Sequence, residues 1–138
     1  WKSIYEFNGD YRVDGIRVGG EERIYPGGRI EKLDLTRHFP WLSPSTQQAR
    51  DVALFRWFSY DWLAFDSSDA SVIVDGRCSQ LPQSTEGLWG IGLDEKRGDE
   101  EPIAWITNRQ TSSEDLAVFY ALLAGGDLDT TPSRQAVE

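Results

Sequence analysis

The sequence predicts an α+β domain: an antiparallel sheet of about six to eight strands with two helices packed on it. Two observations support this class. Short segments rich in apolar and aromatic residues are separated by hairpin-type turn residues, without the helical crossovers that parallel strands need. Two longer segments have the spacing and the capping residues of helices. The 138 residues have the length of one domain of ordinary size.

The N-terminal quarter of the chain predicts an antiparallel meander of four strands. Asn8-Gly9 is the pair most favoured in two-residue hairpin turns, and Pro26-Gly27-Gly28 is a second strong turn signal. Between them, the alternation of apolar and polar residues slips at Gly15, which predicts a β-bulge there. The strands are expected at residues 1–7, 11–18, 23–25 and 29–35.

Two helices are expected in the rest of the chain. The first is predicted to begin at Ser43-Pro44, because a serine hydroxyl caps free N–H groups and proline suits the first helical position, and to end near Phe58. The second has a capping box, Ser112 with Asp115, and is ended by Gly125-Gly126. Further strands are expected at residues 60–65, 72–78, 88–93 and 103–107, with a charged connection at 94–102.

Composition excludes several classes of protein. The chain has 23 Asp and Glu against 14 Lys and Arg, and the net charge of -9 argues against nucleic acid as a partner. No apolar stretch approaches the roughly 20 residues of a membrane-spanning helix. The single cysteine, Cys78, excludes an internal disulfide. We interpret residues 1–126 as a single soluble α+β domain taken from a larger protein, and residues 127–138 as a flexible tail.

Residue types that carry catalysis are sparse. His38 is the only histidine and lies in the connection between a strand and a helix, where no second metal ligand is suitably spaced. Without a suitable histidine base, Cys78 is not expected to act as a nucleophile. Asp61, Asp66 and Asp75 lie near several aromatic residues, as the two carboxylates of a glycosidase do, but aromatic residues at strand spacing are also typical of a core. We expect neither a metal site nor a cofactor in this chain.

The most specific candidate site is the pair Asp75 and Arg77. These residues are two apart in a predicted strand, so their side chains are expected to project from the same face. A charge pair in an otherwise apolar strand costs desolvation unless it is hydrogen-bonded, and this favours a specific role. Two roles stay open: a structural ion pair that anchors a loop, which we favour, and a docking site for a partner.

The order of several short motifs resembles a known family. A hairpin runs from Trp1-Lys2-Ser3-Ile4 to Tyr11-Arg12-Val13-Asp14, a helix closes on Phe55-Arg56-Trp57-Phe58-Ser59, and Val72-Ile73-Val74-Asp75-Gly76-Arg77 precedes Leu88-Trp89-Gly90-Ile91. Over roughly residues 1–93 this order resembles the C-terminal soluble region of the YdjM-like family of membrane-bound, metal-dependent hydrolases. Asp75 and Arg77 match the D-x-R strand of that family. Gly76 stands where a larger apolar residue is usual, and the last helix has no counterpart.

The resemblance implies an extramembrane accessory domain that positions a substrate or a partner beside a catalytic site elsewhere in the parent protein. The family's metal ligands belong to its membrane-embedded part, so the resemblance implies a divalent metal there. The implied partner is that membrane-embedded part of the same chain, and the implied location is the inner membrane. Two alternatives stay open: a free-standing module that binds a small molecule or a glycan on an aromatic-rich sheet face, and an enzyme that acts through carboxylates alone.

Overall fold

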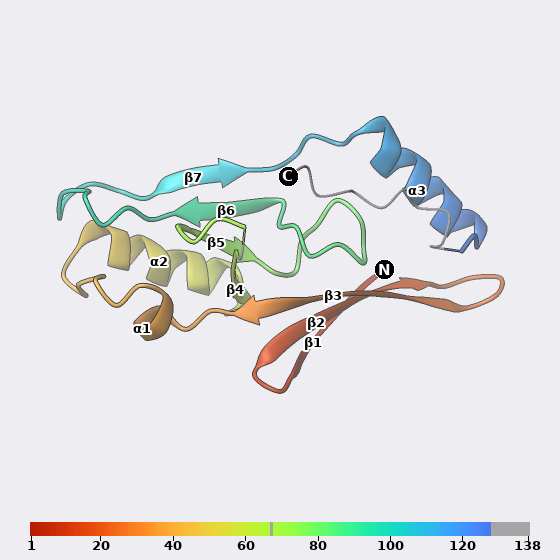
Figure 1. Ribbon diagram of the computed structural model, residues 1–138, viewed down its shortest axis with the longest axis horizontal. Coiled ribbons are helices and arrows are strands. Elements are labelled where there is room, and N and C mark those ends of the chain that lie inside the picture. Colours follow the sequence, from red (N-terminus) through yellow and green to blue (C-terminus); the bar gives the residue numbers. More distant parts are fainter. Residues whose placement is uncertain (67, 128–138) are drawn as a thin grey trace.

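The computed structural model describes residues 1–66 and 68–127. Within them, seven strands form one sheet in which each strand pairs antiparallel with the next along the chain (Figure 1). The predicted fold class and strand number are therefore confirmed. The elements are β1 (Lys2–Phe7), β2 (Asp10–Arg17), β3 (Arg23–Lys32), α1 (Leu35–His38), α2 (Gln47–Phe58), β4 (Leu63–Phe65), β5 (Val72–Asp75), β6 (Trp89–Gly92), β7 (Ala104–Thr107) and α3 (Ser113–Ala124).

The hairpin of β1 and β2 turns where Asn8-Gly9 predicts it. Both residues have positive φ, 53° and 81°, as the preferred two-residue hairpin turn requires. The predicted bulge at Gly15 is wrong, because this residue pairs in regular register with Lys2 on one side and with Tyr25 on the other.

The turn predicted at Pro26-Gly27-Gly28 is also wrong. The two strands predicted at residues 23–25 and 29–35 are one continuous strand, β3. This strand ends at Lys32, where the prediction extended it to residue 35, and the one-turn helix α1 follows, capped by Asp34. Tertiary pairing with β2 on one side and β4 on the other holds the strand extended through the glycines.

A bulge does occur in this hairpin, at the glycines of β3 and not at Gly15. The register shifts between Arg12 and Asp14, so that β3 there holds one residue more than β2. A Cβ on Gly27 would lie 2.3 Å from the carbonyl oxygens of Val13 and Gln83. Glycine therefore permits a close approach of three backbone segments at this point.

Helix α2 covers one face of the central strands. It begins at Gln47, later than predicted, because Thr46 and not Ser43 is the N-cap: Oγ1 of Thr46 accepts the N–H of Ala49. The carbonyl of Ser43 instead accepts both the N–H and the hydroxyl of Thr46, which makes a turn before the helix. The buried core on this face consists of Phe39, Val52, Phe55, Leu63, Ile73, Ile91 and Leu93.

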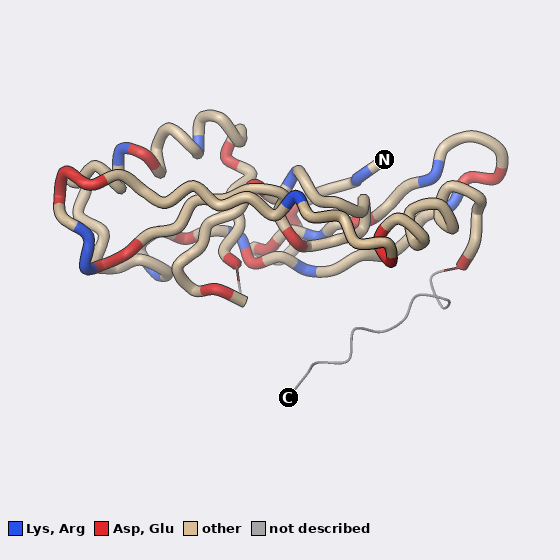
Figure 2. The backbone as a smooth tube through the Cα atoms, turned by 90° about the horizontal axis from the view of Figure 1, so that it is seen from above, with Lys and Arg blue, Asp and Glu red and all other residues tan. Residues whose placement is uncertain are grey.

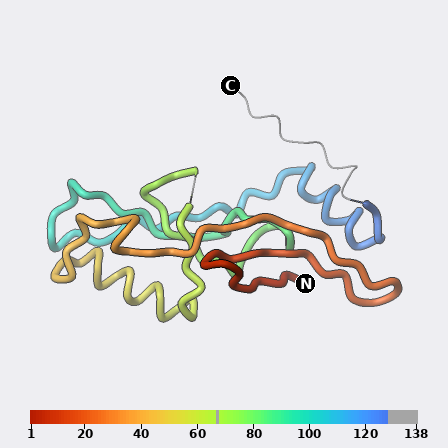
Figure 3. The backbone as a smooth tube through the Cα atoms, turned by 60° about the horizontal axis from the view of Figure 1, so that its bottom comes forward, coloured from red at the N-terminus to blue at the C-terminus, as the bar shows by residue number. Residues whose placement is uncertain are grey.

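A second cluster lies on the opposite face of the sheet. Its buried members are Tyr11, Val13, Ile30, Ala64, Val72 and Val74. Helix α3 has the predicted capping box of Ser112 and Asp115 and ends at Gly125 in the left-handed conformation (φ 83°). It packs through Val118 and Leu122 on Tyr25 of β3. The two longer helices therefore lie at opposite ends of the elongated molecule (Figures 1 and 3).

Two of the short strands differ from the prediction. The strand predicted from Tyr60 begins at Leu63, because Tyr60 and Asp61 have positive φ (52° and 63°) and form a tight turn after α2. The strand predicted to reach Cys78 ends at Asp75. The shortening of β5 bears directly on the candidate site.

Acidic residues gather in the loop between β6 and β7 at one end of the molecule (Figure 2), where the charged connection at 94–102 is predicted. Over residues 1–66 and 68–127, no helix combines the length and the apolar character that crossing a membrane requires. The predicted tail, residues 127–138, lies outside the described residues except for Asp127, which pairs with Arg23 at 3.0 Å.

Candidate functional site

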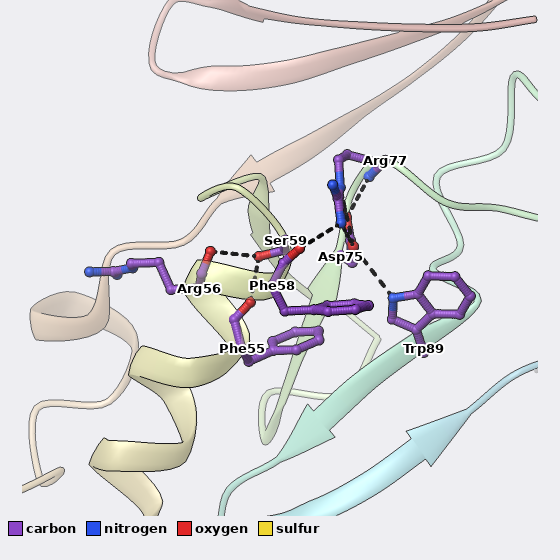
Figure 4. A network of polar contacts seen from close by, with 7 residues as sticks. All are labelled: Phe55, Arg56, Phe58, Ser59, Asp75, Arg77 and Trp89. Atoms are coloured by element: carbon purple, nitrogen blue, oxygen red, sulfur yellow. Dashed lines mark hydrogen bonds and ion pairs between the residues drawn. The ribbon is translucent and has the colours of Figure 1, made fainter.

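Asp75 and Arg77 form a bidentate ion pair after β5 (Figure 4). Arg77 donates through Nε to Oδ1 of Asp75 at 2.9 Å and through Nη2 to Oδ2 at 2.6 Å. Asp75 is fully buried (0 % exposed), whereas the side chain of Arg77 is 28 % exposed. The structure thus brings the two predicted residues together, with the carboxylate inside and the guanidinium at the surface.

The backbone achieves this contact in a different way from the prediction. The expectation that both side chains project from one strand face is wrong, because Gly76 and Arg77 lie in a turn after β5. The N–H of Arg77 donates to Oδ1 of Asp75 at 3.0 Å, a pattern typical of an Asx-turn. A Cβ on Gly76 would lie 3.2 Å from Cδ1 of Ile4, so glycine lets β1 lie close to this turn.

The ion pair also connects the end of α2 to the sheet. Nη2 of Arg77 donates to the carbonyl of Phe58 at 3.1 Å, and Nε1 of Trp89 lies 3.4 Å from Oδ2 of Asp75. The buried Ser59 closes α2 beside them by donating its hydroxyl to a carbonyl of the last turn (Figure 4). The hydrogen bond to Asp75 raises the pKa of Arg77 above its usual value, which favours the charged form of the guanidinium.

The exposed part of Arg77 lies among aromatic side chains. Its guanidinium carbon is 5.3 Å from the ring centroid of Tyr60 and 6.0 Å from that of Phe58. Tyr60 is 79 % exposed and Trp57 76 % exposed. We call Phe58, Tyr60 and Arg77, together with Trp57, which precedes Phe58 in the last turn of α2, the Arg77 surface. Exposed aromatic residues around a fixed cation are typical of an interaction surface.

Lys2 of β1 contacts the segment that follows the same turn. Its Nζ donates to Oγ of Ser79 at 2.8 Å and to the carbonyl of Ser84 at 2.9 Å. Burial lowers the pKa of Lys2 to about 8. Ser79 donates its own hydroxyl to a backbone carbonyl, so its proton is not directed at Lys2 and the two do not form a nucleophile with its base. These contacts tie β1 to the segment after β5.

The only histidine and the only cysteine have packing roles. His38 stacks on Phe65 with ring centroids 4.1 Å apart, and its Nδ1 accepts the N–H of Asp34, which leaves the proton on Nε2, 3.1 Å from Glu31. Burial lowers the pKa of His38 and raises the pKa of the Cys78 thiol, so both side chains are uncharged at neutral pH. In the described part of the chain, His, Cys, Asp and Glu side chains form no group of three that could hold a metal ion.

The three candidate carboxylates are not brought together as a glycosidase would need. Asp61 is exposed and pairs with Arg56 at 3.0 Å. Asp66 accepts the N–H and the hydroxyl of Ser68 in a turn, and it follows the end of β4 that lies away from Asp75. Asp75 is sealed from solvent by its ion pair. None of these carboxylates therefore faces another across a site.

A cleft of about 820 Å³ lies on the sheet face opposite α2. Val72 and Val74 contribute to its floor. Phe65 and Trp89 border it, but their rings pack toward α2 on other aromatic rings. The uncharged polar residues that line it are Ser68, Gln80, Ser84, Thr85, Asn108, Gln110, Thr111 and Ser112. The cleft therefore offers hydroxyl and amide groups, whereas the rings of Phe65 and Trp89 belong to the other face. It is also lined by charged residues, which are Arg29, Glu31, Asp66, Asp69, Glu86 and Asp115.

Sequence reasoning did not predict the exposure of Trp57. Arg56 is the only polar residue in the last turn of α2, so the sequence pattern there does not separate a buried face from an exposed one. A scan against models of protein families, a search of curated proteins and a search of solved structures each found no match. The functional interpretation therefore depends on the motifs and on the geometry of the Arg77 surface.

Proposed function

We propose that this domain is a docking module that binds a partner through the Arg77 surface. The partner is the membrane-embedded part of a membrane-bound, metal-dependent hydrolase, in which this domain is the extramembrane accessory part. The observation that carries the proposal is the fully buried Asp75 that holds a partly exposed arginine among exposed aromatic side chains. The divalent metal and its ligands then belong to the membrane-embedded part, and this domain helps to position it or its substrate.

The anchoring of Arg77 favours binding as well as stability. Its contacts with Asp75 and Phe58 use Nε and Nη2, and within the described residues no hydrogen bond involves Nη1. A guanidinium that is already fixed loses little conformational entropy when it meets a partner. Trp, Tyr and Arg are also the residues enriched at the energetic centres of protein interfaces. The structural role that the sequence favours and the docking role are therefore compatible at this site.

The first test is the coding sequence that precedes Trp1. The proposal predicts several apolar segments of about 20 residues there, each long enough to span a bilayer. Their absence would overturn the membrane-embedded partner. The binding role would then pass to the second candidate below.

The second test separates docking from folding in the full-length protein. Trp57→Ala combined with Tyr60→Asn removes two exposed rings, and asparagine tolerates the positive φ of residue 60. We expect the melting temperature to stay nearly unchanged and cross-linking between the domain and the membrane part to fall about tenfold. Tyr120→Ala, which removes an exposed ring from α3, is the matched control. Unchanged cross-linking in the double variant contradicts the proposal.

A second candidate function is supported by the polar cleft. Its hydroxyl and amide side chains suit a hydroxyl-rich ligand such as a glycan, and its excess of carboxylates disfavours an anionic one. Titration with a panel of neutral oligosaccharides, followed through the backbone amide signals of Gln80 and Asn108, tests this alternative. Saturable shifts confined to the cleft support it, and unchanged spectra argue against it.

A further inference from the structure

The last strand of the sheet has an open edge. β7 pairs with β6 on one side, and within the described residues no strand pairs with its other side. The N–H of Asn108, the residue after β7, donates to the carbonyl of Leu88. Successive residues of a strand direct their backbone N–H and C=O groups to opposite sides, so Ile106, two residues before Asn108, also faces β6. The backbone groups of Trp105 and Thr107 therefore point outward. They form a ready template for another strand.

β7 is short, which limits pairing, but it lacks the other features that usually protect an edge strand. β7 has the sequence Ala-Trp-Ile-Thr, with neither a charged residue nor a proline. Lysine, proline and inward-pointing charges are the common protective devices at sheet edges. An uncharged edge strand with a large aromatic residue at its centre favours association.

An exposed apolar surface continues from the edge onto α2. Asp51 accepts the N–H of Ile103 just before β7, so this side of α2 lies along the strand. Leu54 and Phe58 follow Asp51 by three and seven residues and lie on the same side of the helix. Both are exposed, as is Trp105, which is 57 % exposed and meets the ring of Phe55 edge-on at 5.9 Å. Leu54, Phe58 and Trp105, together with the backbone of β7, form what we call the β7 edge.

The charges at the two ends of β7 identify the partner. The strand runs from an acidic loop, which ends at Glu101, to a basic residue, Arg109. Arg109 lies over the ring of Trp89 at 5.8 Å, on the α2 side of the sheet. Antiparallel pairing of two β7 strands across Trp105 places Glu101 of each copy opposite Arg109 of the other, since both are four residues from the centre. Two copies of this edge are therefore complementary to each other: their strands pair antiparallel, their opposite charges meet, and their apolar side chains face one another.

We infer that the β7 edge is the interface of a symmetric dimer, in which two copies of this chain join their sheets into one through antiparallel β7 strands. The two-fold axis passes beside Trp105, so the two indole rings and the flanking Leu54 and Phe58 side chains cover one another. The β7 edge shares Phe58 with the Arg77 surface, so the two proposals are tested through residues that belong to only one of them: Trp105 for the dimer, and Trp57 and Tyr60 for docking.

The first experiment measures mass against concentration by sedimentation, using the full chain. One copy has a mass of 15.6 kDa, and we expect a reversible shift to twice that value as concentration rises. Trp105→Lys places two ammonium groups side by side at the axis and is expected to weaken association at least a hundredfold. Tyr120→Ala on α3 serves as the matched control. A melting curve of Trp105→Lys establishes that the monomer remains folded.

Charge reversal then tests the register. Glu101→Arg alone and Arg109→Glu alone each place like charges together twice in the dimer, and each is expected to raise the dissociation constant about tenfold. The double variant restores the attraction and is expected to return to within about threefold of the original value. A chain that stays monomeric at all concentrations overturns the inference, as does a dimer that Trp105→Lys leaves intact. A double variant no better than the single ones overturns this register.

Discussion

The two edges of the sheet are protected to very different degrees. β1 carries Lys2 and Glu6, of which Glu6 pairs with Lys32 of β3 at 2.7 Å. Lys2 reaches across to hydrogen-bond the segment after β5. β7 carries no charge, although both edge strands expose aromatic residues, Tyr5 and Phe7 on β1 and Trp105 on β7. One edge is therefore closed by charge and by contacts within the chain, and the other is left open.

The difference extends to the elements beside each edge. Near β1, the guanidinium of Arg17 donates to the carbonyl of Leu123 at 2.9 Å, and Tyr25 donates its hydroxyl to the carbonyl of Leu122 at 3.3 Å, so α3 is fastened to the long hairpins. Near β7, the adjoining side of α2 is apolar and exposed. Exposed edges and apolar patches occur where another chain binds. Both halves contain a buried core, and they differ in whether contacts within the chain hold the element beside the edge strand.

The largest expected effect lies between the two halves. Arg77→Leu leaves the buried Asp75 without its cation, and loss of one partner of a buried pair costs roughly 3 kcal/mol or more. Denaturant unfolding of the variant is expected to show this loss of stability. Arg12→Leu, which replaces an exposed arginine of β2, is the control and is expected to change the free energy of unfolding by less than about 0.5 kcal/mol. Equal midpoints for the two variants would show that Asp75 does not depend on Arg77.

A second change tests the protected half alone. A Cβ on Gly27 meets two backbone oxygens that cannot rotate away, so Gly27→Ala is expected to cost about 1–3 kcal/mol as the bulge is forced open. The midpoint of urea unfolding gives the cost, and amide exchange locates it in β2 and β3. Gly98→Ala is the control, because the nearest atom there belongs to the flexible side chain of Glu101. A larger increase of exchange in β7 than in β2, each relative to the original chain, would contradict a local origin.

The sequence predicts the fold best where the signals are local. Asn8-Gly9, the capping box at Ser112 and the stop at Gly125 depend only on neighbouring residues, and each lies where predicted. Pro26-Gly27-Gly28 has an equally strong local signal for a turn, yet tertiary pairing overrides it, because β3 needs the glycines for a bulge. Local propensity could not show that Val13 and Gln83 approach this position.

The candidate site could be predicted only in part. The D-x-R spacing correctly identifies the partners Asp75 and Arg77, although a turn and not a strand face brings them together. The exposure of Trp57 and the approach of Lys2 to Ser79 depend on contacts that are distant in sequence. Periodicity contains no information on such contacts, so these features required the structure.

A smaller effect is expected from the cap of α3, which bears on the attachment of this helix to the protected half. Ser112→Ala removes the side-chain oxygen that accepts the N–H of Asp115, and loss of such a cap costs about 1 kcal/mol. The free energy of unfolding measures the cost, and amide exchange should accelerate first in the initial turn of α3. Ser45→Ala, at an exposed serine outside any cap, is the control. Unchanged exchange in α3 would show that packing on Tyr25 alone holds the helix.

The smallest effect concerns the charge that protects the β1 edge. Because burial lowers the pKa of Lys2 to about 8 from 10.5, the unfolded chain binds more protons at this site between those two pH values, and stability rises with pH across that window. The measurement is the free energy of unfolding of the original chain minus that of Lys2→Met. We expect this difference to increase from pH 7 to pH 9.5. The increase should be less than about 1 kcal/mol, because water still screens the ammonium. Lys32→Met is the matched control: the hydrogen bond to Glu6 raises the pKa of Lys32, so its contribution stays constant until the pH passes 10.5. A difference for Lys2 that also stays constant would mean that its ammonium remains solvated, and the β1 edge would then be protected by an ordinary surface charge.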